Sequence, residues 1–277
     1  MMETKLLNAY REIFKNKNNE PDWAVHKHEV EHTNKLVHCS IPFVGEKYTE
    51  QKTKILMYAS AENLSGYCGH LDNDDYAINR HRHKFEETAG KENYYFPNVH
   101  IAPIEDGCLA IVALYVLAKF QHLDEITPEK FFEMISFGNF CKYTIESDTN
   151  KDYVGSKKKV SESYEYIEKD FEVLKPDYVI MPKTIYDRNR KFIDSIKGES
   201  KIIPIYQINA GNINRIIKKN YPIDKSSRDE YVATLDKNIQ RWYDELKSNG
   251  ITGKTKENYL GVFAYIDDVL KKNNILG

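Results

Sequence analysis

Residues 202–215 read Ile-Ile-Pro-Ile-Tyr-Gln-Ile-Asn-Ala-Gly-Asn-Ile-Asn-Arg, and the interpretation of the whole chain starts from this stretch. A short apolar run ends abruptly in amides, Ala-Gly and an arginine. This pattern is typical of a buried parallel strand that ends in a loop touching a ligand. Because ligands of open α/β sheets bind outside the carboxyl ends of the strands, we ask which other strands end beside this one.

Three further apolar runs precede this stretch, and each has the length of a buried strand. They span residues 54–59, 137–143 and 177–182. Segments with helical patterns separate them: residues 106–121, the helix that opens at 128–132, and residues 161–174 and 184–196. The alternation of strand and helix predicts an α/β fold with a parallel sheet and right-handed crossovers.

Helices are also expected at both ends of the chain. Residues 2–20 place Leu6, Leu7, Tyr10 and Phe14 on one amphipathic stripe, and two more amphipathic segments cover about 227–248 and 255–272. We therefore divide the chain into three parts. These are an N-terminal helical and irregular extension (1–53), an α/β core (54–222) and a C-terminal helical extension packed on the core (223–277).

Composition excludes several classes of protein. The 277 residues carry a net charge of −2, so overall charge does not draw the protein to nucleic acid, and any DNA contact must come from a local patch. The longest apolar run, residues 108–118, is shorter than the ~20 residues that span a bilayer. The N-terminus lacks the apolar region of a signal peptide, so we expect a cytoplasmic protein without membrane contact.

Metal sites and cofactors are not expected. The four cysteines include no CxxC pair. Residues 28–32, His-Glu-Val-Glu-His, fit the H-E-x-x-H pattern literally. Their strongly polar flanks favour a solvated or partner-facing segment over a zinc helix, and no third ligand follows downstream. Residues 72–75, Asp-Asn-Asp-Asp, lack the glycine and the distal glutamate of a calcium loop.

Polar groups follow three of the predicted strands, in residues 60–69, 139–142 and 207–215. Parallel topology brings these three segments to one edge of the sheet. The first supplies a carboxylate (Glu62), an amide (Asn63) and an aromatic ring (Tyr67). The second supplies Asn139, whose amide can read the edge of a planar base with paired donor and acceptor. The third supplies amides on a glycine-containing loop.

This arrangement resembles the uracil-DNA glycosylase superfamily over about residues 54–218. Residues 139–142, Asn-Phe-Cys-Lys, match the Asn-x-x-Lys motif of several branches, and Lys175-Pro-Asp-Tyr-Val-Ile180 and Ile202-Ile-Pro-Ile-Tyr206 look like the third and fourth strands of the family. The resemblance implies a three-layer α/β/α fold with a central four-stranded parallel sheet. It also implies a DNA glycosylase that needs no cofactor and whose partner is DNA.

The resemblance assigns roles to individual residues. Glu62, Asn63 and Gln207 are the expected catalytic residues, and Tyr67 and Asn139 are expected to hold the flipped base. Lys142, Ile208, Asn209, Asn212 and Arg215 are expected to contact DNA. The chemistry fits these residue types, because a carboxylate stabilises the positive charge that grows on the sugar and an amide donor stabilises the departing base.

Two departures from the family pattern point to an unusual substrate. Residues 59–63, Ala-Ser-Ala-Glu-Asn, lack the Pro-Gly of the first family motif, and Gln207 stands where the family commonly has His. We therefore expect excision of a non-standard or modified base, in DNA repair or in defence against foreign DNA. One alternative is a catalytically inactive nucleic-acid-binding or protein-interaction module on the same fold. A second is a small-molecule enzyme such as a nucleoside hydrolase.

Overall fold

The fold is known from a computed structural model. It describes residues 2–18, 36–38, 41–61, 108–120, 128–145, 160–206, 213–224, 226–248 and 253–275. The strands are β1 (Leu36–His38), β2 (Phe43–Val44), β3 (Ile55–Ala61), β4 (Ser136–Cys141), β5 (Tyr143–Ile145), β6 (Tyr178–Pro182) and β7 (Lys201–Ile205). The larger helices are α1 (Met2–Asn18), α3 (Cys108–Phe120), α4 (Pro128–Met134), α7 (Tyr164–Leu174), α8 (Lys183–Ile196), α11 (Arg228–Thr234), α12 (Lys237–Ser248) and α13 (Gly253–Lys272). Three short turns of helix, η1 (Tyr48–Glu50), η3 (Ile213–Ile217) and α10 (Lys218–Asn220), complete the described elements.

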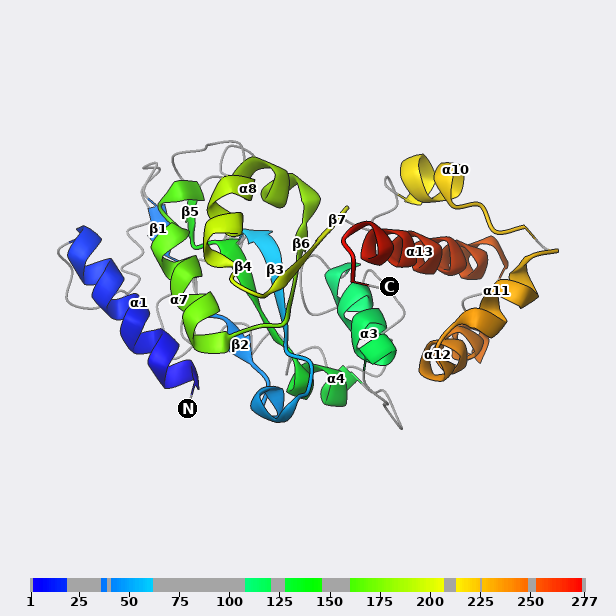
Figure 1. Ribbon diagram of the computed structural model, residues 1–277, viewed down its shortest axis with the longest axis horizontal. Coiled ribbons are helices and arrows are strands. Elements are labelled where there is room, and N and C mark those ends of the chain that lie inside the picture. Colours follow the sequence, from blue (N-terminus) through cyan, green and yellow to red (C-terminus); the bar gives the residue numbers. More distant parts are fainter. Residues whose placement is uncertain are drawn as a thin grey trace.

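A five-stranded sheet with the strand order β2-β4-β3-β6-β7 forms the centre of the molecule (Figure 1). Strands β4, β3, β6 and β7 run parallel to one another, and β2 joins the edge antiparallel to β4. The expected α/β class with a largely parallel sheet is confirmed. The antiparallel edge strand was not expected, and it lies within the segment 1–53 that we separated from the core.

The two faces of the sheet bury different clusters of apolar side chains. Ile55, Met57 and Ala59 of β3 point into a cluster shared with α3, α4, α12 and α13. Leu56 and Tyr58 point to the other face, into a cluster shared with α1, α7 and α8. This alternation is the period of two of a β-strand, and it explains why every side chain from Ile55 to Ala59 is buried.

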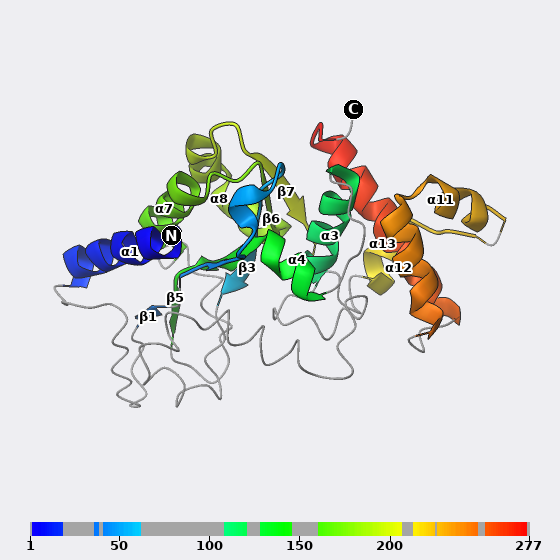
Figure 2. The same cartoon turned by 90° about the horizontal axis from the view of Figure 1, so that it is seen from below.

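The helices at the two ends of the chain lie on opposite sides of the sheet. Figures 1 and 2 show α1 beside α7 at one end of the molecule, and α11, α12 and α13 grouped near α3 at the other. Helix α1 buries Leu6 and Tyr10 of the predicted stripe. The predicted helix 2–20 is thus confirmed over residues 2–18, and residues 19 and 20 lie outside the described part of the chain.

The predicted helix at 227–248 is wrong in one respect, because two helices, α11 and α12, occupy it. Leu235 leaves α11 with an extended backbone, at ψ 156°. The Asp236 carboxylate then accepts the backbone N–H of Asn238 over 2.8 Å, which caps the start of α12. A local side-chain bond therefore ends one helix and begins the next.

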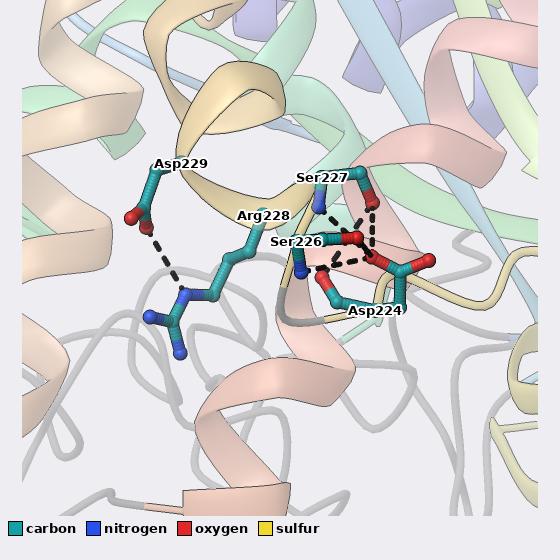
Figure 3. A network of polar contacts seen from close by, with 5 residues as sticks. All are labelled: Asp224, Ser226, Ser227, Arg228 and Asp229. Atoms are coloured by element: carbon teal, nitrogen blue, oxygen red, sulfur yellow. Dashed lines mark hydrogen bonds and ion pairs between the residues drawn. The ribbon is translucent and has the colours of Figure 1, made fainter.

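A second aspartate organises the turn before α11 (Figure 3). The Oδ1 atom of Asp224 accepts the hydroxyl and the backbone N–H of both Ser226 and Ser227, over 2.7 to 3.0 Å. These donors lower the pKa of Asp224 to about 2, the Ser226 hydroxyl contributing most. All three residues belong to a solvent-accessible turn, so the network is a local structural device.

Candidate functional site

The carboxyl edge of the parallel strands is the place where this topology binds ligands. Strand β3 lies between β4 and β6, so the chain proceeds from β3 to one side and then crosses to the other. Such a reversal is a topological switch point, and it leaves a crevice outside the carboxyl ends of the strands. Strand β4 reaches this edge at Cys141 and β6 reaches it at Pro182, and Asn139 lies two residues before the end of β4.

Asn139 lies on β4 with Ala59 of β3 as its register partner. Asn139 is 4% exposed, so its amide is held inside the protein. Because Ala59 and Ala61 of β3 lie alongside β4, the strand that carries Asn139 ends next to the strand that precedes Glu62. The expected meeting of these two strand ends is confirmed.

Lys142 does not have the surroundings expected of a DNA contact. Its side chain is fully buried, and its Nζ atom lies 2.9 Å from Oδ2 of Asp170, which is also fully buried. An ammonium in this position cannot reach a phosphate. The lysine of the Asn-x-x-Lys pattern is therefore part of the internal structure here, and its expected role at the DNA surface is not supported by the geometry.

Asp170 is the centre of a buried polar network. It accepts the Tyr10 hydroxyl at Oδ1 over 2.5 Å and the Tyr58 hydroxyl at Oδ2 over 2.7 Å. Burial, followed by the charge of Asp170, raises the pKa of Tyr58, so this hydroxyl stays protonated and keeps donating. One carboxylate thus joins α1, β3 and α7.

Among the described residues, the Lys142 ammonium has an ion-pair partner but no hydrogen bond of good geometry. We regard the 2.9 Å approach as a true ion pair, because both charges are fully buried and opposite in sign. The rings of Tyr10 and Tyr58 lie 5.4 and 5.3 Å from Nζ and add cation–π contacts. The backbone N–H of Lys142 also donates to Ser163 Oγ over 2.7 Å, which anchors the end of β4 to the start of α7.

Sequence reasoning did not identify Asp170, although a signal was present. The buried positions of α7 are Tyr166, Ile167, Asp170, Phe171 and Leu174, which form one helical stripe. An aspartate within an apolar stripe must be paired if it is buried. The aspartate on this stripe was therefore a candidate for a buried partner of some cation.

Most of the other predicted site residues lie outside the described part of the chain. These are Glu62, Asn63, Tyr67, Gln207, Ile208, Asn209 and Asn212. The His-Glu-Val-Glu-His segment at 28–32 and the acidic cluster at 72–75 also lie outside it. Arg215 is described, and it is exposed on η3. Among the described residues, no group of three or more His, Cys, Asp or Glu side chains could hold a metal ion.

A pocket of about 620 Å³, which we call the β7-end pocket, opens at the carboxyl end of β7. It is bounded by Pro204 and Tyr206 from β7 and its end, by the η3–α10 turn, and by the C-terminal part of α13. Figure 1 shows this end of β7 next to the C-terminal end of α13. This pocket was not predicted from the sequence, because the segment that forms α13 was expected only to pack on the core.

Tyrosines and a few charges line the β7-end pocket. Tyr206, Tyr221 and Tyr265 supply three rings, and Lys183, Lys272 and Asp268 supply the charges. Asp268 accepts the Tyr221 hydroxyl over 2.5 Å and lies 2.7 Å from Lys272 Nζ. The Lys272 ammonium, and then the Tyr221 hydroxyl, lower the pKa of Asp268, while burial raises the pKa of Tyr265 to about 12.

A larger cavity of about 840 Å³ lies at the opposite edge, around the amino ends of β6 and β7. Four lysines and four acidic residues line it, so it favours neither sign of charge. Ligands of parallel sheets bind at the carboxyl edge, and we therefore regard the smaller β7-end pocket as the better candidate despite its size.

The described residues define an α/β protein with a largely parallel sheet and a carboxyl-edge site. The chain matches no protein-family model, no curated protein and no solved structure. Within the described ranges, no helix has the length and apolar character needed to cross a bilayer. The function must therefore be argued from the site alone.

Proposed function

We propose that this protein is a DNA glycosylase-like enzyme that hydrolyses the N-glycosidic bond of a non-standard or modified base flipped out of DNA. The observation that carries the proposal is the position of Asn139 on β4, beside the carboxyl end of β3. An amide fixed at this edge can pair with a base edge, and the segment after β3 follows immediately. The proposal includes the finer fold, a three-layer α/β/α core over residues 54–222.

The reaction replaces the bond between the sugar C1′ and the base nitrogen by a bond between C1′ and a water oxygen. Extrusion of the base from the stack costs a few kcal/mol, and stacking on Tyr67 would return about 1–3 kcal/mol. Glu62 and Asn63 stabilise the cationic sugar and orient the water. Gln207 donates to the departing base, which leaves with the proton that the water gives up.

The segment 207–215 is proposed to enter the duplex. Ile208 would act as the apolar wedge, and Asn209, Asn212 and Arg215 would contact the backbone. Lys142 takes a different part, because its buried pair with Asp170 holds the end of β4 in place. It positions Asn139 from within the protein.

The competing function is a catalytically inactive binding module on the same fold. The buried Lys142 favours this alternative specifically, because one residue of the Asn-x-x-Lys pattern has a structural partner. The two functions predict the same DNA binding and differ only in base release.

An incision assay separates these possibilities. The full chain is incubated with DNA duplexes that each contain one uracil, hypoxanthine, alkylated or oxidised base, and abasic sites are then cleaved with alkali. We expect strand breaks from at least one modified duplex and none from unmodified DNA. DNA binding without any break would establish the binding module. Absence of both DNA binding and strand breaks would point to a small-molecule enzyme.

A further inference from the structure

We propose that the β7-end pocket is a second nucleotide-binding site, which takes a base against its tyrosines and a phosphate at Lys183. The pocket is separate from the region of Asn139. Strands β4 and β7 have β3 and β6 between them, so three strand spacings of about 4.8 Å place the two sites roughly 14 Å apart. This second site does not depend on the excision chemistry.

The size and position of the pocket suit a small ligand. Its volume of about 620 Å³ falls within the range of about 300–1,000 Å³ that is typical of ligand sites. It lies at the carboxyl end of parallel strands, where α/β proteins bind ligands. The wall that closes it comes from α13, so the C-terminal extension contributes half of the site.

The aromatic wall is fixed in place before any ligand arrives. The hydroxyl of Tyr221 donates to the Asp268 carboxylate, and the backbone N–H of Tyr221 donates to Ile217 O over 2.8 Å. The hydroxyl of Tyr265 accepts the backbone N–H of Tyr206 over 2.9 Å, which ties the end of β7 to α13. The Tyr221 and Tyr265 rings lie 5.4 Å apart at 59°. Rigid aromatic rings lose little entropy on binding, and bases stack on them regardless of sequence.

The charges of the pocket favour an anion. Lys183 and Lys272 carry two positive charges against the single negative charge of Asp268. Asp268 and Lys272 neutralise each other over 2.7 Å, so Lys183 is the lining cation whose counter-charge does not itself line the pocket. Lys183 pairs with Asp187 on the same helix, but this pair is half-exposed and a phosphate can replace it at little cost.

The remaining polar groups can distinguish bases from other rings. Asn220 and Asn273 both line the pocket and are exposed. The amide nitrogen of Asn273 donates to Val269 O over 2.7 Å, so Asn220 is the amide that can offer both its groups to a ligand. An amide offers a donor and an acceptor side by side, as the edge of a base does. The tyrosine rings, the amide and the lysine together match the base and the phosphate of a nucleotide.

The ligand can be a free mononucleotide or one nucleotide of a DNA strand, and a titration distinguishes the two sources. The full chain is titrated with deoxyadenosine monophosphate, thymidine monophosphate, inorganic phosphate and a short oligothymidylate strand, with binding followed by calorimetry. We expect Tyr206→Ala and Lys183→Ala each to weaken nucleotide binding about tenfold. Mononucleotide binding identifies a free ligand, and binding of the strand alone identifies DNA.

Matched variants control for loss of structure. Tyr186→Ala and Lys191→Ala alter a half-buried tyrosine and an exposed lysine of α8 that do not line the pocket, and both should bind nucleotide like the wild type. Binding of inorganic phosphate as tight as that of the nucleotides would overturn the proposal, as would unchanged binding in Tyr206→Ala and Lys183→Ala.

The same variants separate this site from the proposed function. Normal base excision by protein that binds no nucleotide at this pocket would refute the second site and leave the glycosylase standing. If the protein binds nucleotide in a manner that depends on Tyr206 but excises no base, the second site stands and the glycosylase proposal is refuted.

Discussion

The ammonium of Lys142 and the carboxylate of Asp170 lie 2.9 Å apart, and both side chains are fully buried. The two charges come from the end of β4 and from the middle of α7. Asp170 also receives hydroxyl donors from Tyr10 and Tyr58, whereas the Lys142 ammonium makes no hydrogen bond of good geometry to any residue that the structure describes. The two partners therefore differ in their hydrogen bonding: Asp170 is well supplied with donors, and Lys142 depends on the ion pair.

This asymmetry predicts unequal costs for removing either partner. Asp170→Asn should lower the free energy of unfolding by about 3–5 kcal/mol, because it leaves a buried ammonium without a counter-charge. Lys142→Met should cost less, since Asp170 retains two hydroxyl donors. Urea unfolding of both variants measures the difference. An equal or larger loss for Lys142→Met would contradict the asymmetry.

The burial of Lys142 also predicts how DNA binding depends on salt. Each lost phosphate contact reduces the slope of log affinity against log salt by about 0.9 on duplex DNA. Lys142→Met should leave this slope unchanged, whereas Arg215→Ala, at an exposed position of η3, should reduce it by about one contact. Titrations at several salt concentrations test both variants. A reduced slope for Lys142→Met would show that the lysine reaches DNA after all.

Asn139 should be needed for base excision beyond its contribution to stability. Asn139→Ala removes the amide at the carboxyl edge, and we expect the excision rate to fall about 100-fold or more, as when one catalytic hydrogen-bond donor is lost. The assay is single-turnover release of the best modified base found.

Asn189 offers a matched control for this variant. It is another buried amide, on α8. Its side chain donates to Ile185 O over 2.8 Å and accepts the Tyr164 hydroxyl over 2.8 Å. Asn189→Ala should destabilise the protein by about 1–3 kcal/mol without a comparable loss of excision. Unchanged excision by folded Asn139→Ala protein would refute the proposed base pocket.

Two glycines should respond differently to the same added methyl group. A Cβ at Gly45 would lie 2.3 Å from the carbonyl oxygens of Phe132 and Glu133, so either β2 or α4 would have to move. Gly198 has a φ of +53° and open space around it, so Gly198→Ala carries only the left-handed strain of about 1–2 kcal/mol. Gly45→Ala should cost distinctly more in thermal unfolding, and the reverse order would contradict the close approach of β2 to α4.

The turn at Asp224 should persist in acid. Because its pKa is lowered in the folded protein, the carboxylate stabilises the fold above the unfolded value of about 3.9, and this contribution is lost as pH falls through about 2. A carboxyl NMR titration should show the midpoint near 2. Replacing Ser226 and Ser227 by alanine together should return the midpoint toward the ordinary value, and an unchanged midpoint would show that these hydroxyls are not the cause.

Local patterns in the sequence were sufficient for the main strands and for most helices. Strands β3, β6 and β7 are continuous apolar runs that end at polar residues or proline, and such runs are recognisable without a structure. Strand β2 could not be recognised, because it has only two residues, Phe43 and Val44, and exists through its pairing with β4. These two residues form a strand because they pair with β4, and not because of a pattern in their own sequence.

The failure at Lys142 has a different cause. The pattern Asn-x-x-Lys is local, whereas burial of the lysine depends on Tyr10, Tyr58 and Asp170, which come from three other elements. Tyr10 and Asp170 are 160 positions apart in the chain. A short motif contains no information about such distant partners, and it therefore could not distinguish a surface lysine from an internal one.

The bond between Tyr10 and Asp170 also sets an order of events while the chain is being made. Helix α1 leaves the ribosome before its partner carboxylate, which follows 160 positions later. At about 5–20 residues per second, α1 waits roughly 8 to 32 seconds for the surface on which it docks. During that time the apolar stripe of Leu6 and Tyr10 has no partner from α7, and it is open to chaperones that bind nascent chains.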